Sequence, residues 1–396
     1  MKISKRAQTV PPSATLAVTS RAKELKKQGV DVIGFGAGEP DFDTPEYIKA
    51  AAIRALKEGK TKYAPASGVP ELRAAIAEKL QRENSLGYTP EQIIVNIGGK
   101  HSVFEAMQAI LEPGDEVILP SPYWVSYPEA IKLSGAVAKV IQTDKSNSYK
   151  ITPQQLKEAI TQKTAMLVIN SPNNPGGFTY TPEELREIAK VLEGTDVVVL
   201  SDEIYEKLIY GQTEFVSFAS LTEDAYNRTL TLNGFSKAFA MTGWRLGYTA
   251  GPVEIIKAMG RLQSHMTSNA VTFCQYAAIA ALQVPADETI EKMRLEFERR
   301  GKYMAERLNS INGVECLEPT GAFYCFPDVS GQYDRTINGT KIAGSMDFAK
   351  ALLEQAKVAV VPGLPFGRDE NVRLSFACSM EHISKGLDRI EKWLSS

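Results

Sequence analysis

Short runs rich in β-branched residues alternate with longer amphipathic stretches along the chain, and no segment repeats. Strands alternating with helices are typical of βαβ units. The pattern therefore predicts a three-layer α/β fold with a mostly parallel sheet. The predicted strands are 92–96, 116–120, 165–170, 196–200, 229–232 and 246–250.

Helical periodicity predicts five main helices, of which the last is long enough to bridge two domains. They are 46–57, 69–83, 101–111, 182–192 and 287–309. The remainder predicts a separate α+β layer: strands 321–327, 358–361 and 372–376, a helix 346–355 and a terminal helix. We expect a large domain at 46–290 and a small domain formed by 1–45 and 291–396, with a cleft between them.

Composition narrows the function. The chain has 396 residues, enough for one large and one small domain. With 45 Lys and Arg against 47 Asp and Glu, it has no field that would attract nucleic acid. No apolar run has the length of a membrane span, and the basic N-terminal stretch lacks the apolar core of a signal peptide, so we expect a cytoplasmic protein. Three scattered histidines and four widely spaced cysteines predict no metal site.

Unusual residues follow five of the predicted strands. In open α/β sheets, ligands bind at the carboxyl ends of the strands, so these residues are expected to meet at one site. They are Gly98-Gly99-Lys100, Tyr123-Trp124, Asn173-Asn174-Pro175, Asp202-Glu203-Ile204-Tyr205 and Ser236-Lys237.

The glycine pair before Lys100 opens a predicted helix and resembles an anion cradle, because free amides and the positive end of the helix dipole point outward there. It is not a Walker loop, since Ile94 replaces the first glycine and His101 the final Ser or Thr. A plain turn is the alternative.

Lys237 has an unusual context, NGFSKAFAMTGWRLG, with apolar neighbours and Arg245 eight residues later. Most lysines are solvated surface residues. An amine among apolar groups and beside a fixed cation has a lowered pKa, which lets it attack carbonyls, and the arginine would hold a phosphate.

Three further residues each have a structural and a functional interpretation. Asp202 is either a helix N-cap or a carboxylate that, with Tyr205, brackets a heteroaromatic ring. Trp124 is either a core aromatic or a plate that stacks on a planar cofactor. Arg373 is either solvated on an edge strand or a fork that receives a carboxylate.

Taken in this order, the motifs resemble those of the class I aminotransferases of the aspartate aminotransferase superfamily. The resemblance runs from Pro12 to the end of the chain and rests on the combination of motifs, not on any single one. It is closest to the branch with bacterial aspartate aminotransferases and aspartate/glutamate–prephenate aminotransferases. The motifs are GAGEPDFDTP, KTKYAP, PYWVSYPE, SPNNP, SDEIY, NGFSKAFAMTGWRLGY and VRLSFA.

The resemblance implies a fold-type I enzyme that uses pyridoxal 5′-phosphate for ping-pong transamination. It implies that Lys237 binds the cofactor aldehyde covalently and later carries a proton, with Asp202 on the pyridine nitrogen. Tyr205 and Asn174 would bond the phenolic oxygen, and Trp124 would stack on the ring. The phosphate would be held by Gly99, the Lys100 backbone, Ser236, Arg245 and Tyr63 of a second subunit in a homodimer.

For the substrate, the resemblance implies that Arg373, Gly38 and Asn174 hold the α-carboxylate. Lys100 and Thr15 match positions that receive a distal carboxylate, which favours aspartate and glutamate, with prephenate as a further acceptor. Lys100 instead contacting solvent and Thr15 instead capping a helix are the alternatives. The competing functions are an aromatic aminotransferase, a lyase with the same cofactor, and a regulator that binds the cofactor without turnover. Gly176, where the family usually has Thr, predicts a looser turn.

Overall fold

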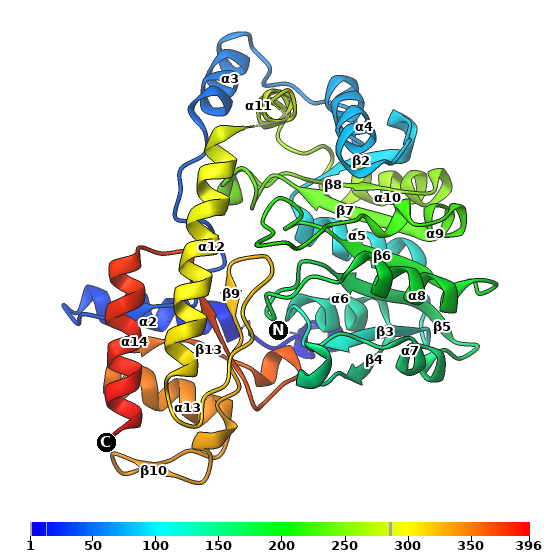
Figure 1. Ribbon diagram of the computed structural model, residues 1–396. Helices are drawn as coiled ribbons and strands as arrows, with labels where there is room; N and C mark the ends of the chain where they lie inside the picture. The colour runs from blue at the N-terminus through cyan, green and yellow to red at the C-terminus, as the bar shows by residue number, and fades with distance from the viewer. Residues whose placement is uncertain (1, 13, 285–286) are drawn as a thin grey trace.

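A computed structural model describes residues 2–12, 14–284 and 287–396, and of residues 14–16 it describes only the backbone. Figure 1 shows a large sheet with its helices on one side of the molecule and a smaller layer on the other. The long helix α12 (Glu288–Asn309) runs between the two. The predicted bridging helix 287–309 is therefore confirmed to within one residue.

A seven-stranded sheet forms the centre of the larger part. All neighbouring strands run parallel except β8, which is antiparallel to both neighbours, so the predicted mostly parallel sheet is confirmed. In spatial order the strands are β2 (Ile93–Asn96), β8 (Gly247–Ala250), β7 (Thr229–Gly234), β6 (Val198–Asp202), β5 (Thr164–Asn170), β3 (Glu116–Ser121) and β4 (Val137–Gln142).

Helices cover both faces of this sheet and bury its apolar side chains in separate clusters. One cluster packs β-strand residues against α5 (Gly99–Ile110), α6 (Ser126–Ser134) and α10 (Val253–Met266). On the opposite face lie α7 (Pro153–Ala159), α8 (Pro182–Leu192) and α9 (Glu223–Arg228). Beside them, α3 (Glu46–Lys57), α4 (Pro70–Asn84) and α11 (Thr272–Leu282) complete the larger part. The predicted three layers are confirmed.

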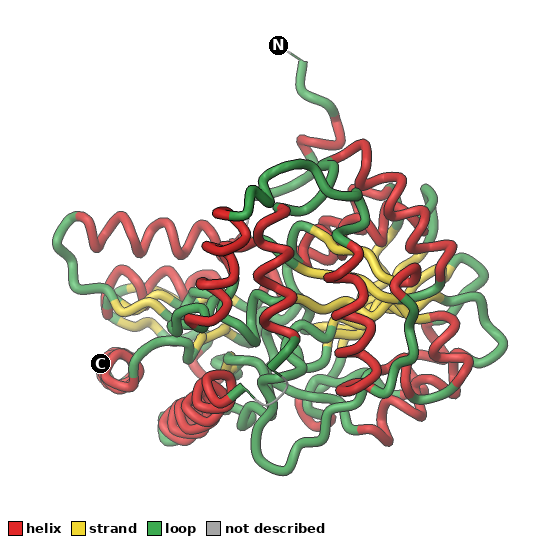
Figure 2. Tube along the Cα trace, turned by 90° about the horizontal axis from the view of Figure 1, so that it is seen from above, coloured by secondary structure: helices red, strands yellow, loops and turns green. Residues whose placement is uncertain are grey.

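The smaller part joins both ends of the chain around one apolar cluster, in which Phe35 meets α14 and the far end of α12. Its strands are β1 (Ile33–Gly34), β9 (Tyr324–Cys325), β10 (Thr336–Ile337), β11 (Thr340–Lys341), β12 (Val358–Ala359), β13 (Val361–Pro362) and β14 (Val372–Ser375). Its helices are α2 (Ala14–Lys27), α13 (Ser345–Ala351) and α14 (Met380–Leu394). A short helix, α1 (Lys5–Gln8), extends away from the body (Figure 2).

Some predicted elements were wrong in extent or were missed. The predicted strand 321–327 is reduced to the two residues of β9, and the predicted helix 346–355 ends in a π-helical segment, Leu352–Ala356. Edge strand β4 was missed, because most of its side chains are at least partly exposed and its pattern lacks a buried run. Helix α11 was missed because it is apolar almost all round and shows no polar face.

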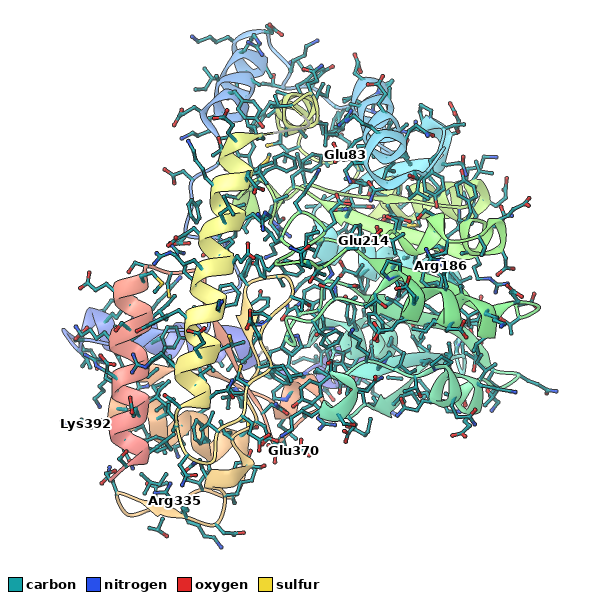
Figure 3. All side chains as sticks on the ribbon, in the orientation of Figure 1. Glu83, Arg186, Glu214, Arg335, Glu370 and Lys392 are labelled. Carbon is teal, nitrogen blue, oxygen red and sulfur yellow. The ribbon has the colours of Figure 1, made fainter. Side chains whose placement is uncertain are left out.

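The surface is covered by charged side chains, such as the exposed Arg186 of α8 and Lys392 of α14 (Figure 3). Among the described residues, no helix combines the length and apolar character needed to cross a bilayer.

Candidate active site

The carboxyl ends of β2, β3, β5, β6 and β7 open into one cavity of about 430 Å³. It lies where the sheet edge meets α2, β9 and β14 of the smaller part. Of the predicted site residues whose side chains the structure describes, all line it except Tyr63. They are Gly38, Gly99, Lys100, Trp124, Asn174, Asp202, Tyr205, Ser236, Lys237, Arg245 and Arg373.

The turn from β2 into α5 leaves no room for side chains. Gly98 has φ +80°, and a Cβ there would lie 2.6 Å from Nη2 of Arg245. A Cβ on Gly247 would lie 2.7 Å from the amide nitrogen of Gly99. The glycines thus bring a guanidinium against the free amides that begin α5, which is a favourable arrangement for a phosphate.

Arg245 stands at the end of a tight loop that begins with Ser236. It adopts a left-handed conformation with φ +54°, and its Nη1 donates to the carbonyl of Thr242 at 2.8 Å. Thr44 fixes this loop from the N-terminal segment: its hydroxyl donates to the carbonyl of Ala240 at 2.8 Å and accepts from Nε1 of Trp244 at 3.1 Å.

The amine of Lys237 points into the cavity. It donates to the carbonyl of Gly38 and lies 5.8 Å from the ring centre of Tyr205. Desolvation lowers its pKa to about 8, and the positive charges of Arg373 and Arg245 act in the same direction. The lowered pKa gives this amine a larger neutral fraction near neutral pH than an ordinary lysine has, which favours its action as a nucleophile and base.

Asp202, the last residue of β6, is a buried carboxylate. Burial raises its pKa to about 6, while a hydrogen bond from the hydroxyl of Tyr127 at 2.6 Å and one from the amide of Ile204 at 3.2 Å act against that rise. The carboxylate is therefore ionised at neutral pH and can accept a further proton donor in the cavity.

Arg373 is a buried cation without a carboxylate partner among the described residues. Its Nη1 donates to Oδ1 of Asn174 at 2.9 Å, its Nη2 donates to the carbonyl of Gly36 at 3.0 Å, and its Nε has no partner. Burial of an uncompensated charge is costly. A buried guanidinium with these neutral partners is suited to bind an anionic ligand.

Two further predicted residues lie together at another wall. Trp124 packs edge-on against Tyr127, with ring centres 5.4 Å apart, and Nζ of Lys100 lies 5.0 Å from the Trp124 ring. Desolvation and the charge of Arg245 lower the pKa of Lys100. Lys100 has no carboxylate partner among the residues described, so its charge is free to meet an anion.

Two predicted residues, Tyr63 and Thr15, remain to be placed. The side chain of Tyr63 is 91% exposed and is not among the residues that line this chain's own cavity. The side chain of Thr15 lies outside the described residues. Thr15 belongs to α2. Two later residues of this helix, Thr19 and Lys23, line the cavity.

Sequence reasoning missed Tyr127, which touches Asp202, and Tyr324, whose hydroxyl lies 3.0 Å from that of Tyr205. The spacing of Tyr127 three residues after Trp124 was a usable signal, whereas nothing in GAFYCF distinguishes Tyr324 from its aromatic neighbours. The prediction of a loose turn at Gly176 was wrong: a Cβ there would lie 2.5 Å from the ring of Phe178.

Comparison with known proteins places this site in a family. The family model for aminotransferase class I and II matches residues 30–390. The chain is 48% identical to an aspartate aminotransferase of Geobacillus stearothermophilus over 399 residues, covering 100% of both chains. It is also 48% identical to an aspartate/prephenate aminotransferase of Cereibacter sphaeroides, covering 96% of both. The structure of a Thermus thermophilus aspartate aminotransferase with maleate matches with a TM-score of 0.93 and 46% identity over 99% of each chain.

The likeness extends over almost the entire chain, so it includes both the large sheet and the smaller layer. It bears out the predicted fold-type I architecture. This chain therefore belongs to the class I and II aminotransferase family.

Proposed function

We propose that this aminotransferase is an aspartate aminotransferase that uses pyridoxal 5′-phosphate. It would convert aspartate and 2-oxoglutarate to oxaloacetate and glutamate by a ping-pong cycle, with prephenate as a second amino acceptor. The observation that carries the proposal is that Lys237, Asp202 and Arg373 open into the same cavity. An amine, a carboxylate and an unpaired cation are the groups that a vitamin B6 aldehyde and an amino acid require.

The residues fit this cofactor. The glycine turn of α5 and Arg245 would hold its phosphate, together with Ser236, Gly99 and the backbone of Lys100. Asp202 would keep the pyridine nitrogen protonated, Trp124 would stack on the ring, and Tyr205 and Asn174 would bond the phenolic oxygen. When bound, the cofactor supplies an electron sink that stabilises negative charge at the substrate Cα.

Each protein group then has a defined task. Arg373 pairs with the α-carboxylate, with Asn174 and Gly38 alongside, and so fixes which bond at Cα faces Lys237. The amine of Lys237 would take the proton from the substrate Cα and deliver it to the carbon of the cofactor's aldehyde group. The hydroxyl of Tyr127 and the amide of Ile204 donate to Asp202 and so favour its ionised form, as a protonated pyridine nitrogen would.

A dicarboxylic substrate is supported by charge. Lys100 would receive the distal carboxylate with Thr15, and no carboxylate among the described residues competes for Lys100. A relative's structure is described with maleate, itself a dicarboxylate. Relatives named for aspartate and for prephenate match equally at 48% identity, which is why both acceptors are proposed.

The proposal also includes a homodimer and a division of the chain into two domains. Tyr63 would reach the phosphate of a second copy, since it is exposed in its own chain, and the active unit would be a homodimer with shared sites. We retain 46–290 as the large domain and 1–45 with 291–396 as the small one.

A panel of single amino acids paired with single oxo acids tests the function. We expect aspartate with 2-oxoglutarate to give oxaloacetate and glutamate at the highest kcat/KM. A preference for phenylalanine or tyrosine would instead favour the aromatic aminotransferase. Release of ammonia and pyruvate from one amino acid would favour a lyase, and cofactor binding without any turnover would favour a regulator.

A further inference from the structure

We propose that Tyr324 is a positioning residue that joins the substrate-binding cation Arg373 to the cofactor-facing phenol Tyr205. The inference rests on the proposed function and assigns a role to a residue that the motifs do not mark. It concerns two separable parts of one side chain, the hydroxyl and the ring.

The hydroxyl of Tyr324 lies on the cofactor side. Tyr324 belongs to β9 of the smaller part, is buried, and places its oxygen 3.0 Å from the hydroxyl of Tyr205, which follows β6 of the large sheet. The two rings meet nearly edge-on, with centres 6.0 Å apart. This hydrogen bond therefore connects the smaller part with the edge of the large sheet.

The ring of Tyr324 lies on the substrate side. Cζ of Arg373 is 4.4 Å from its centre, closer than to the other ring against Arg373, that of Phe366 at 5.2 Å. The ring therefore contacts the guanidinium of Arg373, whose two terminal nitrogens donate hydrogen bonds to Asn174 and to the Gly36 carbonyl. A Cβ on Gly38 would lie only 3.1 Å from the Tyr324 oxygen, so the substrate-binding segment also packs against it.

These contacts have a chemical consequence. When Tyr205 donates to the phenolic oxygen of the cofactor, its own oxygen is free to accept from Tyr324. A hydroxyl that accepts a hydrogen bond is a stronger donor. Tyr324 thus strengthens the bond that draws negative charge from the cofactor oxygen, and its ring keeps Arg373 aimed into the cavity.

The charged and titratable groups facing the two phenols come from three elements. They are Arg373 of β14, Asp202 at the end of β6 and Lys237 of the loop after β7. Tyr324→Phe replaces none of these groups and keeps the ring against Arg373, so a change in the cofactor's titration in this variant reports on the hydroxyl itself.

Two variants separate the hydroxyl from the ring. Tyr324→Phe removes only the hydrogen bond, and Tyr324→Leu removes the ring as well. Tyr180→Phe is the matched control, since Tyr180 is also buried and hydrogen-bonded, by the amide of Ile151, but lies outside the cavity.

The first measurement is the pH titration of the cofactor's absorption in holoenzyme without substrate. For Tyr324→Phe we expect the midpoint to rise by about half a pH unit, because a weaker Tyr205 bond leaves more negative charge beside the titrating proton. Tyr205→Phe should shift it further in the same direction, and Tyr180→Phe should not shift it.

The second measurement is the KM for aspartate and for 2-oxoglutarate. We expect Tyr324→Phe to leave both within about twofold, and Tyr324→Leu to raise both about tenfold, as the loss of a desolvated cation–π contact implies. An unchanged absorption midpoint in Tyr324→Phe, or an unchanged KM in Tyr324→Leu, would overturn the assignment. Failure of the wild-type protein to take up the cofactor would instead refute the proposed function.

Discussion

At the scale of single residues, the ionisation of Asp202 depends on Tyr127. Burial raises the pKa of Asp202 to about 6, and the Tyr127 hydroxyl limits that rise. Because the carboxylate must be ionised to hold a protonated pyridine, activity should fall at acid pH as Asp202 takes up a proton.

Tyr127→Phe should raise the pKa of Asp202 and move the acid limb of the kcat/KM profile to higher pH. We expect a loss of about tenfold at pH 7, the size expected for one hydrogen bond to a charged group. Tyr149→Phe, which removes a buried hydroxyl bonded by Asn371 away from the cavity, is the control. An acid limb at the same pH in Tyr127→Phe would contradict this role.

Lys100 decides between dicarboxylic and other substrates. Lys100→Met keeps the length of the side chain and removes its charge. The KM for aspartate should rise about tenfold, while that for alanine should stay unchanged, since alanine has no distal carboxylate. Lys190→Met, on the exposed face of α8, controls for loss of a positive charge. Equal losses with both substrates would reject the proposed contact.

At the scale of elements, segment 38–44 clasps the loop 236–245. Besides the Thr44 contacts, Gly38 accepts from Lys237 and Glu39 accepts from Thr242 at 3.0 Å. The loop holds Ala240 at φ +51° and Arg245 at φ +54°, conformations that are unfavourable for residues with side chains. The clasp therefore helps to keep Arg245 facing the glycine turn.

Thr44→Val should remove both hydrogen bonds to the loop, because valine has nearly the same shape as threonine but lacks the hydroxyl. We expect the dissociation constant of pyridoxal 5′-phosphate to rise about tenfold, from roughly 1.4 kcal/mol of lost support. Titration of the apoenzyme by absorbance measures it, and Thr44→Ser should restore most of the affinity. Identical affinities in Thr44→Val and wild type would refute the clasp.

The sequence predicted most accurately the helices that bury one continuous apolar stripe. The bounds of α3 and α8 were predicted to the residue, because an apolar stripe and, in α8, the capping box of Thr181 and Glu184 mark them. Edge strand β4 has no such stripe. Strand β9 has only two residues, because the residues that flank it in the predicted strand 321–327 lie in loops. The rule that ligands bind at the carboxyl ends of parallel strands identified the site residues of the large sheet. It could not identify Tyr324, because that residue belongs to β9 of the smaller part.

At the scale of the whole molecule, the exposed Tyr63 bears on whether one chain alone forms a complete phosphate site. Tyr63 stands in the KTKYAP motif and is 91% exposed, while the phosphate cradle of the same chain is built without it. The exposed hydroxyl of Tyr63 is therefore accessible to a second copy of the chain.

We therefore expect light scattering to give a mass of about twice 43.4 kDa. Tyr63→Phe should leave this mass unchanged and raise the dissociation constant of the cofactor about tenfold through loss of one hydrogen bond to phosphate. A fully active monomer would contradict the shared site, as would a Tyr63→Phe dimer with undiminished affinity.

The most direct test of the account is borohydride reduction of the protein loaded with pyridoxal 5′-phosphate, followed by digestion and mass spectrometry. The account predicts a stable pyridoxyl adduct on Lys237 and none in Lys237→Ala, which should also lose turnover. An adduct on a different lysine, or no adduct on a protein that still transaminates, would contradict it.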